Sequence, residues 1–174
     1  MARKAVFLDR DGVVNIEKDY VYKVEDFEFL DGIVDAIKHF NKQGYIVVIV
    51  TNQSGIGRGY YTEEDFEKLT KYMLGHFEDE GAKIAAVYHC PHSPDTKCDC
   101  RKPLPGMFLK AKEELNIDMQ NSWMIGDKES DIKAALTAGV GHTILVRTGH
   151  KIDEANTKAS FVFNGVFDTI EVIK

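Results

Sequence analysis

The sequence predicts an α/β protein in which one parallel β-sheet lies between two layers of helices. Three observations lead to this prediction. Short apolar runs rich in β-branched residues alternate with segments whose apolar residues recur at helical spacing. The apolar runs do not alternate with polar residues, which is typical of strands that are buried on both faces. No repeat, low-complexity tract or flexible linker divides the chain, so we expect residues 1–174 to form a single domain.

Six strands are expected, and helical patterns lie between them. The strands are Ala5–Asp9, Ile46–Thr51, Ala85–Cys90, Trp123–Asp127, Thr143–Arg147 and Phe161–Asn164. Trp123 opens the fourth strand and is most simply a core residue. The clearest helical patterns are Phe66, Leu69, Met73 and Phe77 in one segment, and Ile132, Ala135 and Leu136 in another. Gly139 is the expected C-cap of the second pattern.

Composition excludes several classes of protein. The chain has 174 residues, of which 44% are hydrophobic and 29% charged, as in ordinary globular domains. Its longest apolar run, Tyr45–Val50, is too short to span a bilayer, and its N-terminus lacks the apolar core of a signal peptide. A net charge of -6 argues against a broad surface for nucleic acid or anionic membrane. We therefore expect a cytoplasmic protein that binds small molecules.

Polar side chains follow the predicted strands. Asp9 and Asp11 follow the first strand, Thr51 ends the second and Asp127 ends the fourth. The carboxyl ends of parallel strands meet at one edge of a sheet, where ligands bind. Neighbouring carboxylates repel each other unless a cation accompanies them, and oxygen ligands suit Mg²⁺. Alternatively, "DRDG" is only a turn, because Asp and Gly favour turns.

All three cysteines lie in the segment "CPHSPDTKCDC", an arrangement that suggests a metal site. Cys90, His92, Cys98 and Cys100 form a Cys₃His set, which matches a structural, tetrahedral Zn²⁺ site with no open position. The alternative is a group of buried thiols beside an unrelated histidine. Arg101 and Lys102 follow directly, so a zinc-bound loop would hold these two cations in place.

Four motifs, "DRDG", "VTNQSG", "CRKP" and "IGDKESD", resemble those of the haloacid dehalogenase (HAD) superfamily of phosphatases. The resemblance covers nearly the whole chain. It implies a HAD-like Rossmannoid fold of three layers with a central parallel sheet. The segments between the motifs are too short for a large cap domain, so loops at the strand ends are expected to select the substrate.

The residues of these motifs suit phosphoryl transfer. Asp9 can attack phosphorus and form an aspartyl-phosphate, and Asp11 can serve as general acid and then general base. Mg²⁺ is expected on Asp9, Asp127 and the main-chain carbonyl of Asp11. Thr51 and Lys102 are expected to hold the remaining phosphoryl oxygens.

Longer stretches, such as "YVYKVEDFEFLDG" and "TNQSGIGRGYYT", match one branch of the superfamily more closely. That resemblance implies removal of the 7-phosphate from D-glycero-D-manno-heptose 1,7-bisphosphate by a monomeric enzyme, in the synthesis of nucleotide-activated heptose. The residues that it implies for substrate binding are Glu17, Asp19, Tyr20, Asn52, Gln53, Ser54, Arg101 and Lys128.

Two other functions stay open. Histidinol-phosphate phosphatases also have a short zinc loop, although "GIGRGYYT" favours the sugar substrate. A non-catalytic sugar-phosphate binder is the alternative from another class, and the complete set of catalytic residues argues against it.

Several side chains have two possible interpretations. Asp131 is either a support for the metal ligands or a first-turn helix charge. Arg58, Tyr60 and Tyr61 either contact substrate or belong to the surface and the core. The remaining isolated histidines are interpreted as surface or core residues rather than ligands and are given no catalytic role, namely His39, His76, His142 and His150.

Overall fold

The protein is built on one sheet of six parallel strands. The computed structural model describes all of residues 1–174. The strand order is β3-β2-β1-β4-β5-β6, and every neighbouring pair is parallel. The strands are β1 (Ala5–Leu8), β2 (Ile46–Asn52), β3 (Ala86–Cys90), β4 (Trp123–Gly126), β5 (His142–Val146) and β6 (Phe161–Phe163). The predicted α/β class is confirmed, and each predicted strand is found within one residue of its expected ends.

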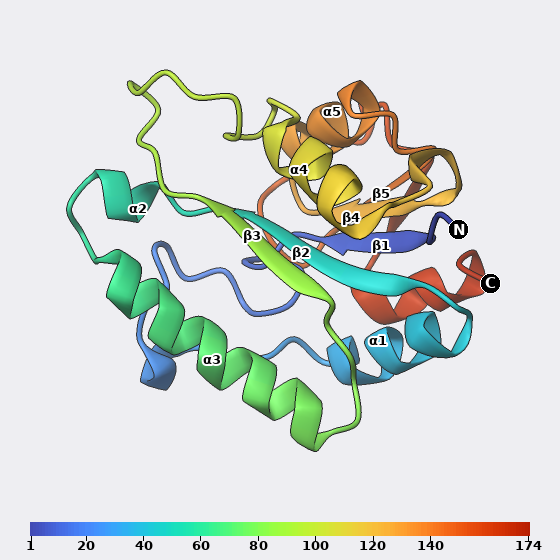
Figure 1. Ribbon diagram of the computed structural model, residues 1–174, viewed down its shortest axis with the longest axis horizontal. Coiled ribbons are helices and arrows are strands. Elements are labelled where there is room, and N and C mark those ends of the chain that lie inside the picture. Colours follow the sequence, from blue (N-terminus) through green and yellow to red (C-terminus); the bar gives the residue numbers. More distant parts are fainter.

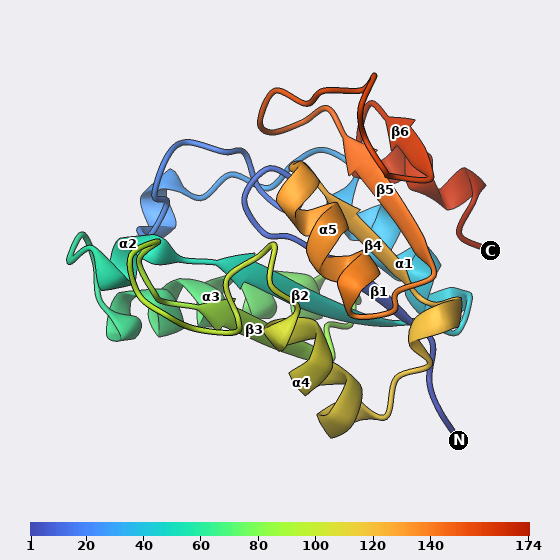
Figure 2. The same ribbon diagram turned by 90° about the horizontal axis from the view of Figure 1, so that it is seen from above.

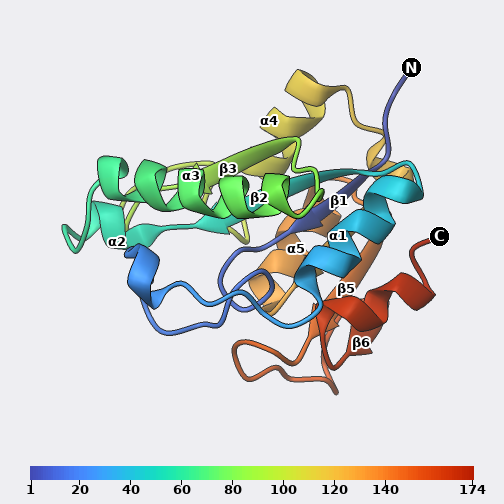
Figure 3. The same cartoon turned by 90° about the horizontal axis from the view of Figure 1, so that it is seen from below.

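Helices cover both faces of the sheet (Figure 1). One face carries α1 (Ile33–Lys42), α3 (Glu63–Asp79) and the 3₁₀ segment η3 (Val166–Glu171), and these are nearest the viewer in Figure 3. The other face carries α4 (Gly106–Leu115) and α5 (Glu129–Thr137), which lie above the sheet in Figure 1 and toward the viewer in Figure 2. Shorter segments are η1 (Val24–Asp26), α2 (Ser54–Gly57) and η2 (Met119–Asn121).

The two faces of the sheet contribute to two separate cores. Phe7 of β1 packs on Phe108 of α4 in one core, while its neighbour Leu8 faces the core under α1 and α3. Successive residues of a strand point to opposite faces, so a strand covered on both sides must be apolar throughout. This requirement explains the continuous apolar runs of the sequence. Trp123 is 7% exposed and packs in the core, as predicted.

Local signals explain where the helices begin and end. Thr62 caps α3, since its hydroxyl accepts from Asp65 N at 3.1 Å and the Asp65 carboxylate accepts from Thr62 N at 2.9 Å. Gly139 (φ +91°) follows α5, but the C-cap is Ala138, one residue before the predicted position. The Val140 N–H bonds to Ala135 O at 3.0 Å, which is the closing bond of a Schellman motif.

The carboxyl ends of the strands lie at the left of the molecule in Figure 1, opposite both chain termini. The loops that follow β1, β2, β3, β4 and β5 all leave the sheet at this edge. β1 and β4 end one residue earlier than predicted, so Asp9 and Asp127 belong to these loops and their side chains are free to turn toward each other. None of the helices combines the length and the apolar character that crossing a membrane requires.

Candidate active site

Three buried carboxylates meet at the carboxyl edge of the sheet. Asp9 follows β1, Asp127 follows β4, and Asp131 lies in the first turn of α5. One oxygen of each lies within 4.8 Å of the other two, and none of the three residues is more than 8% exposed. The sequence predicted the convergence of Asp9 and Asp127, and the structure adds Asp131.

Lys102 lies beside these carboxylates. Its Nζ is 3.1 Å from Asp9 Oδ1 and 2.7 Å from Asp131 Oδ1, and it donates to Val50 O at 2.9 Å. Burial by itself would lower the pKa of Lys102, but Asp131 and Asp9 raise it above its ordinary value. Lys102 is therefore a permanent cation that balances part of the negative charge. Asp131 is a first-turn residue of α5, as one interpretation had it, and it is also a charge partner of Lys102. Its support of the metal ligands stays a prediction.

The carboxylates still carry more charge than Lys102 balances. Burial, followed by repulsion from Asp131, raises the pKa of Asp9 well above its ordinary value, although Lys102 opposes the shift. Burial would also raise the pKa of Asp127, but hydrogen bonds from His150 lower it. An additional cation would relieve the repulsion that Asp9 experiences.

His150 holds the carboxylate of Asp127, a contact that was not predicted from the sequence. Its backbone N–H and its Nδ1 donate to Asp127 Oδ2 at 3.0 and 2.7 Å. The signal was its position four residues after β5, at the same edge of the sheet. His39, in contrast, bonds to Ile173 O at 2.7 Å, and His142 stacks on Trp123, consistent with structural roles.

The donor set at this edge fits Mg²⁺. Asp127 Oδ2 is occupied by His150, whereas Asp127 Oδ1 is buried and has no hydrogen-bond partner. A buried acceptor without a partner is costly, and a cation would satisfy it. Asp127 is also packed tightly, because a Cβ at either Gly12 or Gly149 would come within 2.2 Å of its Oδ2. Asp9 and Asp127 are thus suited as ligands. The predicted contribution of the Asp11 carbonyl stays a prediction.

Asp11 lies beside the carboxylate cluster, and its side chain is held by three neighbours. Arg10 contacts both carboxylate oxygens, Asn15 Nδ2 donates to Oδ1 at 2.9 Å, and Gln53 Nε2 donates to Oδ2 at 3.1 Å. Arg10 was not predicted to belong to the site, although it stands within the "DRDG" motif. Because its neighbours in sequence are both carboxylates, its charge was the available signal.

Thr51 and Asn52 end β2 at the same edge. Thr51 is 1% exposed, and its hydroxyl accepts from Gln53 Nε2 at 2.9 Å. Asn52 joins β2 to the loop of Lys102, since its Oδ1 accepts from Lys102 N at 3.0 Å and its Nδ2 donates to Lys102 O at 3.2 Å. Asn52 was predicted to bind substrate, and the structure also shows it holding the lysine loop.

A polar pocket of about 230 Å³ opens next to the carboxylates. All eight residues predicted to bind substrate line it, from Glu17 to Lys128, and they are joined by Asp11, Arg58, Tyr61 and His150. A hollow of about 460 Å³ beside α3 is larger, but Leu74, Ala82 and Ile84 supply much of its lining and no carboxylate cluster adjoins it. Chemistry rather than size therefore identifies the site.

Two loops form the outer wall of this pocket. In the first loop Asp19 and Tyr20 have φ values of +57° and +54°, and Glu17 Oε1 accepts from Asp19 N at 2.6 Å. Tyr20 meets Tyr60 of the second loop edge to face, with centroids 4.9 Å apart. Both rings are about half exposed, at 43% and 54%.

Tyr61 is 5% exposed, stacks on Tyr22 at 5.0 Å and donates to Gln53 Oε1. This bond assigns the Gln53 amide so that its nitrogen faces Asp11 and Thr51. Tyr61 is therefore both a buried packing residue, as one interpretation of the sequence had it, and part of the pocket wall.

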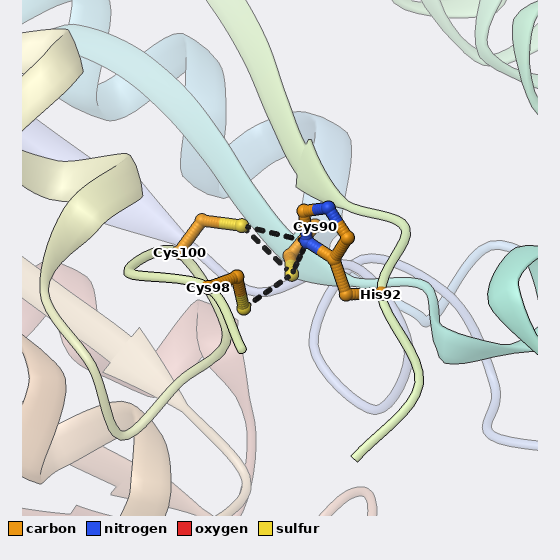
Figure 4. A group of neighbouring side chains, drawn as sticks. All are labelled: Cys90, His92, Cys98 and Cys100. Carbon is orange, nitrogen blue, oxygen red and sulfur yellow. Dashed lines mark hydrogen bonds between the residues drawn. The ribbon is translucent and has the colours of Figure 1, made fainter. Parts of the chain in front are cut away.

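The four predicted zinc ligands converge (Figure 4). One donor atom from each of Cys90, His92, Cys98 and Cys100 lies within 4.8 Å of the others. All three cysteines are free thiols. Partial burial would raise the pKa of Cys98, but backbone N–H groups of Arg101 and Cys100 outweigh it and lower the pKa to about 7. Burial raises the pKa of Cys90 and of Cys100. The number and type of the four donors, rather than the pKa values of the thiols, therefore fit Zn²⁺.

Comparison with known proteins agrees with the class that this fold and site define. A family model described as HAD-hydrolase-like matches residues 99–171. The D-glycero-beta-D-manno-heptose-1,7-bisphosphate 7-phosphatase of Yersinia pestis is 47% identical over 98% of this chain and 95% of its own. The chain therefore belongs to the heptose-1,7-bisphosphate 7-phosphatase family, within the HAD superfamily of phosphoric monoester hydrolases.

Two further relatives bear on the site. The D-glycero-alpha-D-manno-heptose-1,7-bisphosphate 7-phosphatase of Campylobacter jejuni is 55% identical over 87% of each chain. A crystal structure of D,D-heptose 1,7-bisphosphate phosphatase from B. bronchiseptica, complexed with magnesium and phosphate, has a TM-score of 0.85. That protein is 32% identical, and the match covers 97% of this chain and 96% of that chain.

Proposed function

We propose that this chain removes the 7-phosphate of D-glycero-D-manno-heptose 1,7-bisphosphate through an aspartyl-phosphate on Asp9. One observation supports the proposal most strongly. The cluster of Asp9, Lys102 and Asp127 lies next to a pocket that is lined by the eight residues predicted to bind substrate. Identity of 47% over nearly the whole chain to a named heptose bisphosphate phosphatase supports the sugar substrate over histidinol phosphate and over a non-catalytic binder.

In the first half of the reaction, Asp9 attacks the phosphorus of the 7-phosphate while Asp11 gives a proton to the leaving sugar oxygen. Lys102 lies beside Asp9, and Thr51 lies near the end of the neighbouring strand β2. Both would stabilise the phosphoryl oxygens. Lys102 needs little reorganisation for this role, because Asp131 and Val50 O already hold its Nζ.

In the second half, Asp11 takes a proton from a water molecule that attacks the phosphorus, and Asp9 is released. Asp9 and Asp127 would hold Mg²⁺, assisted by the Asp11 carbonyl. The bound cation would neutralise the nucleophile and the phosphate so that two anions can approach. His150 keeps Asp127 Oδ1 available for this purpose by occupying Oδ2.

Cys90, His92, Cys98 and Cys100 would hold a structural Zn²⁺. The role of this site would be positional, since Arg101 and Lys102 directly follow the last cysteine. A small displacement of a catalytic group is enough to reduce turnover. The zinc loop would thus act on catalysis through the position of Lys102.

The outer pocket would hold the sugar and its second phosphate. It presents three cations, Arg58, Arg101 and Lys128, which suit an anionic group. It also presents Glu17, Asp19 and Tyr20, which can bond to sugar hydroxyls. We therefore propose a small, phosphorylated sugar as the partner of this chain.

The test measures phosphate release with Mg²⁺ from both anomers of heptose 1,7-bisphosphate and from histidinol phosphate, compared as kcat/KM. We expect one sugar anomer to exceed histidinol phosphate by at least about 10²-fold, because buried polar groups discriminate strongly against a ligand that leaves them unpaired. A preference for histidinol phosphate would overturn the proposed substrate but leave the phosphatase chemistry standing. An absence of release from all three would overturn the proposed activity.

A further inference from the structure

Arg10 is the residue of the "DRDG" motif to which the proposed chemistry gives no role. Its side chain is 1% exposed, which makes it one of the largest fully buried side chains of the molecule. Arginine is rarely buried unless its charge is paired, because removal of the charge from water is expensive. The groups that surround Arg10 therefore indicate what the buried cation does.

Arg10 forms a salt bridge with the carboxylate of Asp11. Its Nη2 lies 3.0 Å from Oδ1 and 3.1 Å from Oδ2, and its Nε lies 3.3 Å from Oδ1. Asp11 is the only carboxylate with which Arg10 forms a salt bridge. A guanidinium with several donors in one plane fixes the orientation of a carboxylate, which the point charge of a lysine does not.

The guanidinium is itself held in place. Its Nη2 donates to Val21 O at 2.8 Å. The rings of Phe27 and Phe66 lie close by, with centroids 5.8 and 5.9 Å from Cζ, within the range of cation–π attraction. The charge is therefore anchored by the backbone and by aromatic packing from two separate elements.

Amide groups complete the environment of Asp11. Asn15 donates to Oδ1 at 2.9 Å and Gln53 donates to Oδ2 at 3.1 Å, so each oxygen accepts from Arg10 and from one amide. The Asp11 side chain is nevertheless 19% exposed and lines the pocket beside Asp9. Asp11 is thus held from behind while its remaining surface faces the substrate.

We propose that Arg10 is a positioning residue that holds Asp11 for proton transfer in both halves of the reaction, an inference that rests on the proposed role of Asp11. As the bond between phosphorus and the sugar oxygen breaks, that oxygen takes the Asp11 proton, and Arg10 stabilises the carboxylate that remains. As water attacks, its proton returns to Asp11 and the bond from Asp9 to phosphorus breaks. Asp11 then carries its proton again, as it did at the start of the reaction.

Leaving-group basicity separates this role from a purely structural one. A sugar alkoxide is strongly basic and needs the proton, whereas p-nitrophenolate departs without it. The ratio kcat/KM covers only the steps up to the transfer of the phosphoryl group to Asp9, so hydrolysis of the aspartyl-phosphate does not affect it. Replacement of Arg10 should therefore lower kcat/KM for the sugar bisphosphate and leave kcat/KM for p-nitrophenyl phosphate nearly unchanged.

The experiment compares Arg10→Lys, Asp11→Asn and the double variant on both substrates. For Arg10→Lys we expect kcat/KM for the sugar bisphosphate to fall by about 10²-fold, as for a displaced catalytic group, and that for p-nitrophenyl phosphate by less than about threefold. Asp11→Asn should show the same selectivity, and the double variant should lose no more than Asp11→Asn, because the two residues act as one unit. Arg147→Lys is the matched control, since Arg147 holds Glu154 at the surface at 2.6 Å.

Equal losses on both substrates for Arg10→Lys would overturn the role of Arg10. If Asp11→Asn leaves the ratio of the two kcat/KM values unchanged, the role of Asp11 as general acid is overturned instead. A failure of the Arg10 proposal can therefore be told from a failure of the proposed role of Asp11. If Arg10→Lys does not fold, Phe27→Leu supplies the test, because it loosens the packing of Arg10 and keeps its charge. It should lower the ratio of the two kcat/KM values by about threefold to tenfold, and an unchanged ratio in a folded Phe27→Leu protein would contradict the proposal.

Discussion

The two ends of the site are built differently. The phosphate end, which consists of Asp9, Lys102, Asp127 and Asp131, comes from two strand ends, the loop before α4 and the first turn of α5, and all four residues are at most 8% exposed. The outer wall of the pocket comes from two loops, and Tyr20 and Tyr60, one from each loop, are 43% and 54% exposed. Side chains at the phosphate end hold one another, whereas these two tyrosines contact mainly each other.

This difference indicates which kinetic parameter each end of the site controls. Charge stabilisation in a transition state needs groups that are already in position, which buried and mutually bonded side chains provide. Recognition of a sugar needs hydrogen-bonding groups that can differ from one protein to another, which loops provide. We therefore expect changes at the phosphate end to lower kcat and changes in the outer pocket to raise KM.

The largest expected effect comes from Asp9→Asn. The amide cannot act as the nucleophile, so kcat should fall by at least about 10⁴-fold, as for the loss of other catalytic nucleophiles. Asp19→Asn is the matched control in the outer pocket, and there we expect mainly a higher KM. Steady-state kinetics on the sugar bisphosphate make the comparison. A similar fall of kcat in both variants would remove the distinction between the two ends.

The second effect concerns the cysteine cluster, which joins the phosphate end through Arg101 and Lys102. Cys98→Ser should lower zinc content and reduce kcat by about 10²-fold, because the loop that holds Lys102 loses its anchor. Ser93→Ala, in the same loop but outside the ligand set, should keep both zinc and activity. Elemental analysis and kinetics on the same samples provide the readout. Zinc loss with normal kcat would show that the cluster does not position Lys102.

A smaller effect is expected from His150→Ala. Asp127 loses one of its two His150 donors, so the Mg²⁺ concentration for half-maximal activity should rise by about tenfold, the lower range for residues that orient metal ligands. At saturating Mg²⁺ we expect kcat close to that of the unmodified protein. His142→Ala, at the start of β5, is the control. If the Mg²⁺ concentration for half-maximal activity is unchanged, the backbone N–H of residue 150 is sufficient to hold Asp127.

The smallest effect is predicted for Tyr61→Phe, where the two ends meet. The variant keeps the stack on Tyr22 but loses the hydrogen bond to Gln53, so stability should fall by about 1 kcal/mol. Tyr60→Phe removes an exposed hydroxyl and should change stability by less than about 0.5 kcal/mol. Urea unfolding measures both. Equal stability of the two variants would mean that the Tyr61 bond adds nothing to the fold.

Local sequence was sufficient for much of this molecule. Every strand was predicted to within a residue at each end, because burial on both faces demands continuous apolar runs. Asp9, Thr51 and Asp127 were predicted to converge because they stand at the ends of parallel strands, whose edge is shared. The convergence of the four candidate zinc ligands was predicted from residue types within one short segment, where the chain itself keeps these side chains close.

Only the tertiary structure decided the remaining contacts. The pairing of β4 with β1 and β5 brings the loop after β5 onto Asp127, and His150 with it. Arg10 turns inward to Val21, Phe27 and Phe66, and Asp131 turns toward Lys102. Periodicity fixes which face a strand or helix residue occupies, but a side chain in a loop takes its direction from distant neighbours. For that reason the sequence by itself predicted the candidate nucleophile and the types of metal ligand, and the packing determined the residues that hold these side chains in position.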